Sequence, residues 1–430
     1  MATMKIVHII TRLILGGAQE NTLYTCEGLH RRGHEVTLIT GPGRGPEGQL
    51  MERALAGGYR VIEVRSLRRA IHPWSDLRAY WRLKKLLRAL DPEIVHTHSA
   101  KAGILGRWAA DVVRRERVRV CCPAATAFQE SRLRQCGRPR IVHTIHGLAF
   151  HPYQGEWLNR LYIGIERRAA ERTDVLISVA DAMTQQALAV GVGQRGQYVR
   201  VFSGLETGAF LAGPDEARRR AVRKELGIPS DAVVIAKVAR LFDLKGHEYV
   251  IEAAKRLAGE YPKAIWLFIG GGKRREQLER QIARARLLDR FRFTGLVPPE
   301  RIAELLHASD ILVHASLREG LARALPQAML CGKAVVSFDV DGAREVVRGG
   351  DTGFLVRPKD VAGLAEALGV LLRDPELRER MGASGRELCR REFDHEVMVD
   401  RIEKVYRQEA ARLGASEQGL GVGMSEETSP

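Results

Sequence analysis

The chain has 430 residues, of which 45% are hydrophobic and 28% are charged. At roughly 150 residues per domain, this length predicts two or three domains with substantial cores and excludes a peptide or mini-protein. No run of about 18 consecutive apolar residues occurs, which excludes a membrane-spanning helix. The six cysteines include no Cys-x-x-Cys pair, and the opening MATMKIVHII lacks the pattern of a secretory signal. We therefore expect a protein of the reducing cytoplasm.

The formal net charge of +16 is concentrated in the first half of the chain. Residues 1–204 hold 31 basic and 17 acidic side chains, whereas residues 205–430 hold 37 and 35. Nine basic and two acidic residues lie between Arg60 and Arg88, and eight and two lie between Arg114 and Arg140. A half-molecule this basic favours an anionic partner such as phospholipid, nucleic acid or a phosphorylated substrate. A basic surface without a specific partner is the alternative.

Short runs rich in valine and isoleucine alternate with segments of helical spacing along the chain. In the first half the predicted strands are KIVHII, EVTLIT, YRVIEV, EIVHTH, IVHTIH, DVLISVA and YVRVF. In the second half they are AVVIAKVA, AIWLFIG, FRFTG, ILVHAS, KAVVSFD and GFLV. Near-continuous apolar runs indicate strands buried on both faces, which requires parallel sheets with helices on either side.

Two such series predict an α/β protein of two doubly wound, Rossmann-like domains that face each other across a cleft. The boundary is expected near a stretch that contains glycine and proline, so we assign residues 1–204 and 205–394 to the two domains. Residues 395–412 have the apolar spacing of an amphipathic helix, which should cross back to the N-terminal domain because the second sheet is already covered.

Two segments fall outside this pattern. Val120 to Arg140 is small, polar and basic, and we interpret it as a surface loop or insertion. Residues 413–430 lack apolar periodicity and are predicted to be a disordered tail.

Ligands of open α/β sheets bind outside the carboxyl ends of the strands. After the first strand, Gly16 and Gly17 open a helix, where the backbone can approach an anion closely; a plain turn is the alternative. No GxGxxG or GxxxxGK[ST] motif occurs, which disfavours NAD and ATP. In the second domain, Arg240 follows the strand and Lys245 lies just before the next helix. The two cations would suit a diphosphate, although two solvated surface charges would give the same pattern.

The segment SLREGLARALPQ, Ser316 to Gln327, is the most informative of the sequence. Glu319 stands at the end of a strand and is followed by glycine and a helix, so we expect this carboxylate in the cleft. A carboxylate can accept hydrogen bonds from vicinal sugar hydroxyls, and the amides that follow can bind phosphate. Gln327 lies two helical turns further on.

In these motifs the chain resembles the retaining glycosyltransferases of the GT-B fold, family four. The GGA loop, the strand–RL–KG segment and the Glu-Gly-x7 motif occur in that family's order and spacing, over roughly residues 4–410. The segments HTHSAKAGILGRWAA, HTIHGLAFHPY and SLREGLARALPQAM are especially similar to bacterial members that build cell-surface polysaccharide.

The resemblance implies a role for each motif. Glu319 would bind hydroxyls of the transferred sugar, and His146 would lie near the reactive carbon of the donor sugar. The implied donor-binding residues are Gly16 and Gly17 at the sugar phosphate, Arg240 and Lys245 at the diphosphate, Gly295 and Val297 at the base, and Gly320, Leu321, Ala322, Arg323 and Gln327 at the phosphates and ribose. His96, His98 and His143 lie within strands and are interpreted as packing or supporting residues.

One position departs from the family. Where its members usually carry a second glutamate, this chain has Gln327, which accepts a hydrogen bond without charge and leaves the base of the donor open. Neither a metal nor another cofactor is expected, because relatives of this fold typically need none and the Asp-Val-Asp at 339–341 lies where a turn is expected.

The expected activity is transfer of a sugar from a UDP- or GDP-linked donor to a hydroxyl with retention, in polysaccharide or glycolipid synthesis. The departing diphosphate would serve as the base, so no strong protein nucleophile is needed. A nucleotide-sugar 2-epimerase shares the architecture but would require extra carboxylates in the cleft, and the Glu-Gly-x7 segment argues against it. A nucleic-acid-binding protein is disfavoured, because no binding motif is recognisable and aromatic residues make up only 6%.

The charge pattern adds an anionic membrane surface to the expected partners, beside a carbohydrate or lipid-linked acceptor. Trp74, Tyr80 and Trp81 lie within the first basic segment, and amphipathic aromatic side chains favour the headgroup level. Each basic residue near an anionic surface contributes about 1 kcal/mol. We therefore expect salt-reversible, peripheral binding at the inner face of the cytoplasmic membrane.

Overall fold

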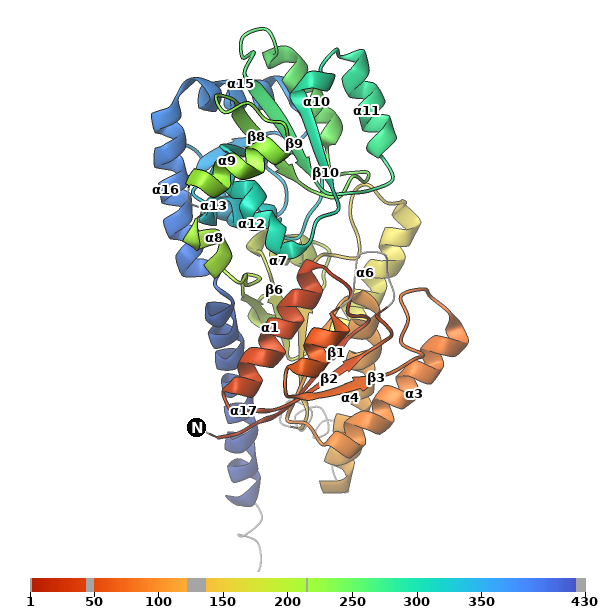
Figure 1. Cartoon of the computed structure of the whole chain (residues 1–430). Helices are drawn as coiled ribbons and strands as arrows, with labels where there is room; N and C mark the ends of the chain where they lie inside the picture. Colours follow the sequence, from red (N-terminus) through yellow and green to blue (C-terminus); the bar gives the residue numbers. More distant parts are fainter. Residues whose placement is uncertain (1, 44–49, 122–136, 214–215, 423–430) are drawn as a thin grey trace, which may run out of the picture. The chain divides into compact units, whose positions relative to one another are not determined.

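The computed structural model describes residues 2–43, 50–121, 137–213 and 216–422. The chain divides into two compact units (Figure 1): Met1–Gly204 with His395–Pro430, and Leu205–Asp394. The segment Val120 to Arg140 was expected to be a loop or insertion. Most of it, residues 122–136, lies outside the described residues.

The N-terminal unit is built on a parallel sheet of seven strands in the order β3-β2-β1-β4-β5-β6-β7. The strands are β1 (Lys5–Ile10), β2 (Glu35–Thr40), β3 (Arg60–Glu63), β4 (Ile94–His98), β5 (Arg140–Ile145), β6 (Val175–Ser178) and β7 (Tyr198–Arg200). The helices are α1 (Gly17–Arg31), α2 (Met51–Ala56), α3 (Pro73–Leu90), α4 (Ala100–Cys121), α6 (Glu156–Ala170), α7 (Asp181–Ala189) and α17 (His395–Val422), with a 3₁₀ turn at Arg195–Gln197. The strand order reverses between β1 and β4, which is where such sheets bind ligands.

Helices cover both faces of this sheet. On one face, Ile6 and Ile94 share a core with Leu23 of α1 and with α17. On the other face, Val7 packs in a core that includes Leu83 of α3 and residues of α4. Burial on both faces accounts for the nearly continuous apolar runs of the strands.

Helix α17 completes the first of these cores. Its buried residues there are Met398, Val399, Ile402, Val405 and Tyr406. Gly28 lets α1 approach, since a Cβ at that position would lie 2.8 Å from Val399 Cγ2. The helix continues to Val422, which lies within the segment 413–430 that was predicted to be a disordered tail. A helix anchored on a core gains a hydrogen bond with each added residue and needs no apolar stripe to extend.

The C-terminal unit has a parallel sheet of six strands in the order β10-β9-β8-β11-β12-β13. The strands are β8 (Val233–Val238), β9 (Ala264–Ile269), β10 (Phe291–Gly295), β11 (Ile311–His314), β12 (Ala334–Phe338) and β13 (Gly353–Val356). The helices are α8 (Gly208–Ala212), α9 (Glu216–Glu225), α10 (His247–Leu257), α11 (Arg275–Arg284), α12 (Pro299–His307), α13 (Ala324–Leu330), α14 (Ala343–Val346), α15 (Val361–Arg373) and α16 (Pro375–Glu392), with a 3₁₀ turn at Leu288–Arg290. The strand order here reverses between β8 and β11. Two parallel, doubly wound sheets confirm the predicted α/β class.

The basic residues of the N-terminal unit are distributed differently from the expectation. Arg114 and Arg140, in the second basic segment, are buried and both pair with Asp174, at 2.8 and 3.2 Å. Arg140 also pairs with Glu409 of α17. The segment Arg114 to Arg140 was predicted to contact a membrane, but these two arginines of it are buried and pair within the unit instead.

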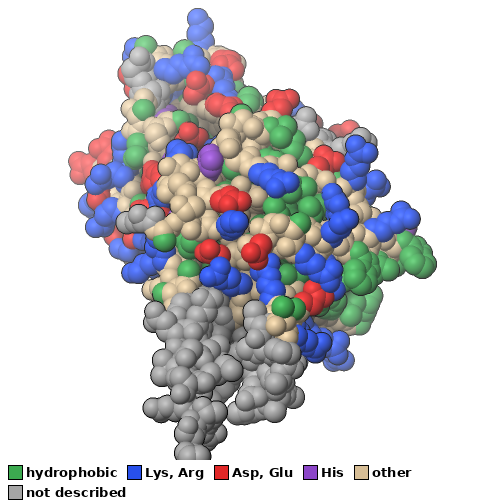
Figure 2. All heavy atoms as spheres, turned by 90° about the horizontal axis from the view of Figure 1, so that it is seen from below, with side chains coloured by type: hydrophobic (Ala, Val, Ile, Leu, Met, Phe, Trp, Pro, Cys, Tyr) green, Lys and Arg blue, Asp and Glu red, His purple; other side chains and the backbone are tan. Residues whose placement is uncertain are grey.

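The first basic segment remains at the surface. Figure 2 shows Lys and Arg side chains among Asp and Glu, with hydrophobic side chains gathered at the right margin, where α3 lies in Figure 1. Ile71, Trp74, Leu77 and Trp81 are all exposed in and just before α3. Among the described residues, no helix is both long enough and apolar enough to cross a membrane.

Candidate functional site

Two loops of the C-terminal unit meet where its strand order reverses. Lys245 lies in the loop after β8, and Glu319 follows β11, the neighbouring strand. Lys245 Nζ lies 2.6 Å from Glu319 Oε1, and the two side chains are 25% and 20% exposed. The backbone joins the loops as well, because the N–H of Leu317 donates to the carbonyl of Leu244 at 2.8 Å.

The glycine after Lys245 is required by this close approach. Gly246 has a φ of 67°, in the left-handed region, and a Cβ there would lie 1.8 Å from the carbonyl oxygen of Ala315. Only glycine fits such a position. The Lys-Gly pair therefore brings the start of α10 against the end of β11 and carries Lys245 to Glu319.

A third strand end supports Glu319 through a residue that sequence reasoning had set aside. Asp341, in the loop after β12, accepts a hydrogen bond from the backbone N–H of Glu319 at 2.7 Å. Gly342 N–H donates to the carbonyl of Gly320 at 3.2 Å. Asp341 itself has a φ of 47°. The turn expected at 339–341 is thus present, and its carboxylate fixes the backbone at Glu319.

The charges at this site are held in partly buried surroundings. Burial alone would raise the pKa of Glu319, but the positive charge of Lys245 and its hydrogen bond to the carboxylate outweigh burial, and the pKa falls below its ordinary value. Glu319 is therefore ionised at neutral pH. Arg318, beside it, has a pKa lowered mainly by burial.

Lys237, on β8, is a buried cation that the sequence analysis missed. Its side chain is fully buried, and its Nζ has no hydrogen-bond partner among the described residues. Burial and the repulsion of Lys245 lower the pKa of Lys237 to about 7, against the attraction of Glu319. A single lysine inside the apolar run AVVIAKVA was the available signal. With this pKa, Lys237 is only partly charged at neutral pH, and its buried amino group lacks a partner in the described part of the chain.

Two histidines complete the polar surroundings of Lys237. Burial is the main cause of the low pKa of both rings. It lowers the pKa of His314 to about 3, and it lowers the pKa of His247 as well. Neither ring nitrogen of His247 has a hydrogen-bond partner among the described residues. Both rings are therefore neutral at neutral pH, and the positive charge here belongs to the lysines.

The other donor-binding residues predicted in this unit lie on the same edge of the sheet without joining the ion pair. Gly295 ends β10, two strands from β8 or about 10 Å away, and Val297 lies in the loop that follows. The guanidinium of Arg240 lies 5.0 Å from the centre of the Phe242 ring. The loop Gly320, Leu321, Ala322 and Arg323 leads from Glu319 into α13. Gln327 is partly exposed on that mainly buried helix.

In the N-terminal unit, Gly16 and Gly17 stand at the start of α1 as predicted from the sequence. His146 follows β5 and is partly buried. Its Nε2 lies 3.2 Å from Nδ1 of His98, on the adjacent strand β4. The structure therefore connects this predicted catalytic residue to a buried histidine group that the sequence did not reveal.

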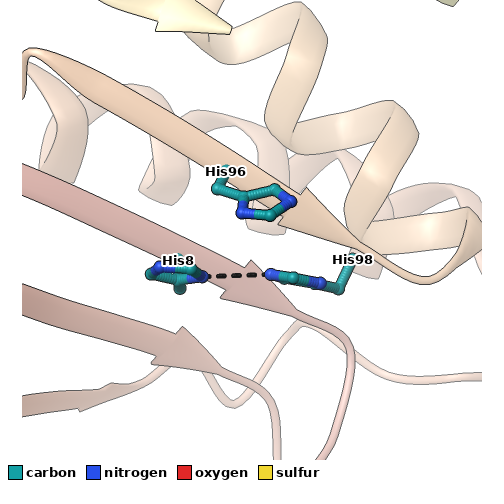
Figure 3. Close-up of side chains that lie close together, drawn as sticks. All are labelled: His8, His96 and His98. Carbon is teal, nitrogen blue, oxygen red and sulfur yellow. Dashed lines mark hydrogen bonds between the residues drawn. The ribbon is translucent and has the colours of Figure 1, made fainter. Parts of the chain in front are cut away.

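That group consists of His8 on β1 with His96 and His98 on β4 (Figure 3). His8 Nδ1 lies 3.0 Å from His98 Nε2. His96 Nδ1 is hydrogen-bonded to the Tyr406 hydroxyl, which lies 3.5 Å from His8 Nε2. His96 Nε2 lies 2.7 Å from Thr144 Oγ1. A chain of hydrogen bonds thus runs from Thr144 through Tyr406 of α17 to His146.

The chain is electrically neutral. Burial lowers the pKa of His8 to about 3 and of His146 to about 4, lowers those of His96 and His98 as well, and raises the pKa of Tyr406. A neutral histidine donates through one ring nitrogen and accepts through the other. The direction in which Tyr406 donates therefore sets the direction of every bond between it and His146.

The same three histidines are close enough to hold a metal ion, with one nitrogen of each within 4.8 Å of the others. All six of their ring nitrogens, however, already take part in hydrogen bonds to His146, Tyr406, Thr144 or one another. Metal binding would have to break several of these bonds. The donor set in this arrangement fits a hydrogen-bonded chain better than a metal centre.

Comparison with known families covers both units. Residues 16–202 match the family model described as a glycosyl transferase 4-like domain, and residues 218–388 match the one described as glycosyl transferases group 1. The chain is 26% identical to UDP-Gal:alpha-D-GlcNAc-diphosphoundecaprenol alpha-1,3-galactosyltransferase of Escherichia coli, over 94% of this chain and 96% of the relative. It is 31% identical to alpha-maltose-1-phosphate synthase of Mycolicibacterium smegmatis, over 64% and 74%.

Solved structures share the fold. HepE of Anabaena in complex with UDP superposes with a TM-score of 0.75 at 19% identity, over 94% of this chain and 100% of that one. WaaG, a glycosyltransferase involved in lipopolysaccharide biosynthesis, superposes with a TM-score of 0.70 at 16% identity, over 93% and 99%.

Replacing the unpaired ammonium group should stabilise the C-terminal unit. We expect Lys237→Met to raise its free energy of unfolding by about 1 kcal/mol or more, because an apolar chain of similar length replaces a buried charge. Lys245→Met should lower the free energy of unfolding, because Glu319 loses its partner. Urea unfolding would measure both changes.

The gain from Lys237→Met should depend on pH. Between pH 7 and the ordinary lysine pKa, the unfolded chain holds a proton that folded Lys237 has lost, so the stability of the native protein rises with pH. The advantage of the variant should therefore shrink from pH 7 to pH 10. A less stable Lys237→Met protein at pH 7 would contradict this account of the site.

Tyr406→Phe should destabilise the N-terminal unit by about 1–3 kcal/mol, because buried nitrogens of His96 and His8 would lose their partner. Tyr59→Phe is a matched control, since Tyr59 is buried in the same core and its hydroxyl has no partner among the described residues. Urea unfolding with equal losses in the two variants would refute the hydrogen-bonded chain.

Proposed function

This chain belongs to the GT-B glycosyltransferases of family four, and we propose that it transfers a sugar from a nucleotide diphosphate sugar to a hydroxyl group with retention at the anomeric carbon. The observation that carries this proposal is the group of Lys245, Lys237 and Glu319 at the ends of β8 and β11. Two lysines beside one carboxylate suit a ligand that has both phosphate and sugar hydroxyls.

In this proposal the lysines bind the diphosphate of the donor. Lys237 provides a buried positive charge without a hydrogen-bond partner among the described residues, and Lys245 can move from Glu319 to a phosphate oxygen. Arg240, after the same strand, adds a guanidinium group, which bonds phosphate in a fork. These cations meet the charge of the diphosphate, so the proposal includes no metal or other cofactor.

Glu319 would then accept hydrogen bonds from hydroxyls of the transferred sugar. The hydrogen bond from its backbone N–H to Asp341 holds the residue in place, so its carboxylate is positioned before the donor arrives. The loop Gly320 to Arg323 offers backbone amides to the phosphates. Gly295 and Val297 would contact the base, and Gln327 would accept a hydrogen bond from the ribose.

The chemical step follows from this arrangement. The bond from the anomeric carbon to the phosphate oxygen breaks, and the acceptor oxygen forms its bond to that carbon on the same face. The proton of the acceptor hydroxyl passes to the departing phosphate oxygen. The lysines stabilise the charge that develops on the leaving group. His146, with Gly16 and Gly17 on the acceptor side, would contact the transferred sugar and its phosphate.

The names of similar proteins support the choice of donor. HepE was solved with UDP and with UDP-glucose, and the relative from Escherichia coli is named for a UDP-galactose donor. That relative is also named for a lipid-linked acceptor, and WaaG for lipopolysaccharide synthesis. We infer a carbohydrate or lipid-linked acceptor in polysaccharide or glycolipid synthesis, used at the inner face of the cytoplasmic membrane.

A donor screen with purified protein tests this function. We expect release of nucleoside diphosphate from one nucleotide sugar, and we expect Glu319→Gln to lower kcat/KM for it by about 100-fold, because the amide cannot hold Lys245 or the sugar hydroxyls equally well. Glu276→Gln, which removes an 85% exposed carboxylate on α11, is the control and should act as wild type. Full activity in a folded Glu319→Gln protein would remove the site from consideration.

A further inference from the structure

A cavity of about 600 Å³ lies within the N-terminal unit, apart from the histidine chain. It is lined by Arg12, Pro42, Glu63, Arg65, Arg68 and Arg69. Arg12 follows β1, Pro42 follows β2, and the remaining arginines follow β3. The cavity therefore lies at the carboxyl ends of three adjacent strands, on the edge of the sheet where ligands of this fold class bind.

The positive charge of this cavity is not balanced by acidic residues of its own lining. Four arginines and one glutamate line it, and among the described residues none of the four arginines forms an ion pair. Elsewhere in the same unit, arginines are tied to carboxylates, as Arg53 is to Glu27 and Arg107 is to Glu166, each at 2.8 Å. An anion with several oxygens that bound among these arginines would offset their like charge.

The chain passes directly from this cavity into α3. Ile71, Trp74, Leu77 and Trp81, spaced three or four residues apart, are 75%, 73%, 48% and 56% exposed. The opposite side of the helix packs into the core through Ala79, Leu83 and Leu87. Arg78, Arg82 and Lys85 are exposed on the same helix. An apolar face with cations beside it is suited to an anionic lipid surface.

The position of the cavity also matches the chemistry of the proposed transfer. Arg12 follows β1 and His146 follows β5, and only β4 lies between those strands. At the usual strand spacing, the two strand ends are about 10 Å apart. A ligand whose anionic group lies among the arginines can therefore extend a short saccharide along the sheet edge toward His146.

We propose that this cavity binds the diphosphate group of a lipid-linked acceptor, with the exposed face of α3 against the lipid. The inference deepens the proposed function and rests on it, because it names the class of acceptor that the transferase uses. The arginines would form forked hydrogen bonds to the phosphate oxygens, and the apolar side chains of α3 would take the first part of the lipid chain. The acceptor hydroxyl would lie beyond the diphosphate, at the end of β5.

Binding of synthetic alkyl phosphates to the full chain tests this site. With UDP present to occupy the donor site, calorimetric titration should show that decyl diphosphate binds and that decyl phosphate binds roughly tenfold more weakly. The triple variant Arg65→Gln, Arg68→Gln, Arg69→Gln should lose about tenfold or more in affinity for decyl diphosphate. Its affinity for UDP should not change.

The matched control removes the same charge from the neighbouring surface of α3. The triple variant Arg78→Gln, Arg82→Gln, Lys85→Gln should bind decyl diphosphate within about twofold of wild type, because these residues lie outside the cavity. Equal losses in the two triple variants would mean a general effect of charge and would overturn the proposal. A cavity variant that binds as wild type does would overturn it as well.

A second measurement separates the helix from the cavity. Trp74→Ser with Trp81→Ser should weaken co-sedimentation with phosphatidylglycerol vesicles while leaving the affinity for inorganic diphosphate, which has no alkyl chain, near that of wild type. Unchanged sedimentation would remove α3 from the proposal.

Failure of the proposed function can be distinguished from failure of this inference. If wild type neither binds UDP nor releases it from any nucleotide sugar, the proposed function fails. Loss of decyl diphosphate binding only in the cavity variant would still support the anion site.

Discussion

The candidate site residues of this chain stand mostly at or just beyond the ends of parallel strands, and the ion pair between Lys245 and Glu319 is the contact on which the C-terminal site depends. The two residues are 74 positions apart, and Gly246 alone allows the backbones to come close enough for it. Asp341 then fixes the backbone of Glu319 from a third strand. The carboxylate is therefore held beside cations, and the proposed binding of a sugar and a diphosphate side by side rests on this arrangement.

The two units bury their characteristic polar groups differently. The N-terminal unit holds a chain of neutral histidines in which every link is a hydrogen bond, so none of these rings carries a desolvated charge. The C-terminal unit instead keeps the ammonium group of Lys237 buried without a partner among its described residues. A buried ammonium group without a partner costs stability, and in the proposed function an anionic ligand would provide the missing partner.

The sequence predicted the fold well because both sheets are parallel and buried, so each strand is an apolar run that can be recognised without its neighbours. Glu319, Lys245 and Gly246 could be found because they follow such runs. Asp341, Lys237 and Tyr406 could not, because their roles depend on contacts that only the folded chain makes; Tyr406 lies 310 residues from His96. A count of charges could not show that Arg114 and Arg140 are buried, since their partners are distant in sequence.

The most direct test of the account is proton NMR of the first product formed from a nucleotide sugar and an acceptor hydroxyl. The anomeric coupling constant reports the configuration before any slower equilibration of the product. For an α-linked donor, the account predicts release of nucleoside diphosphate together with an α-linked product. A β-linked product would contradict retention, and an intact donor with every nucleotide sugar would contradict the transfer itself.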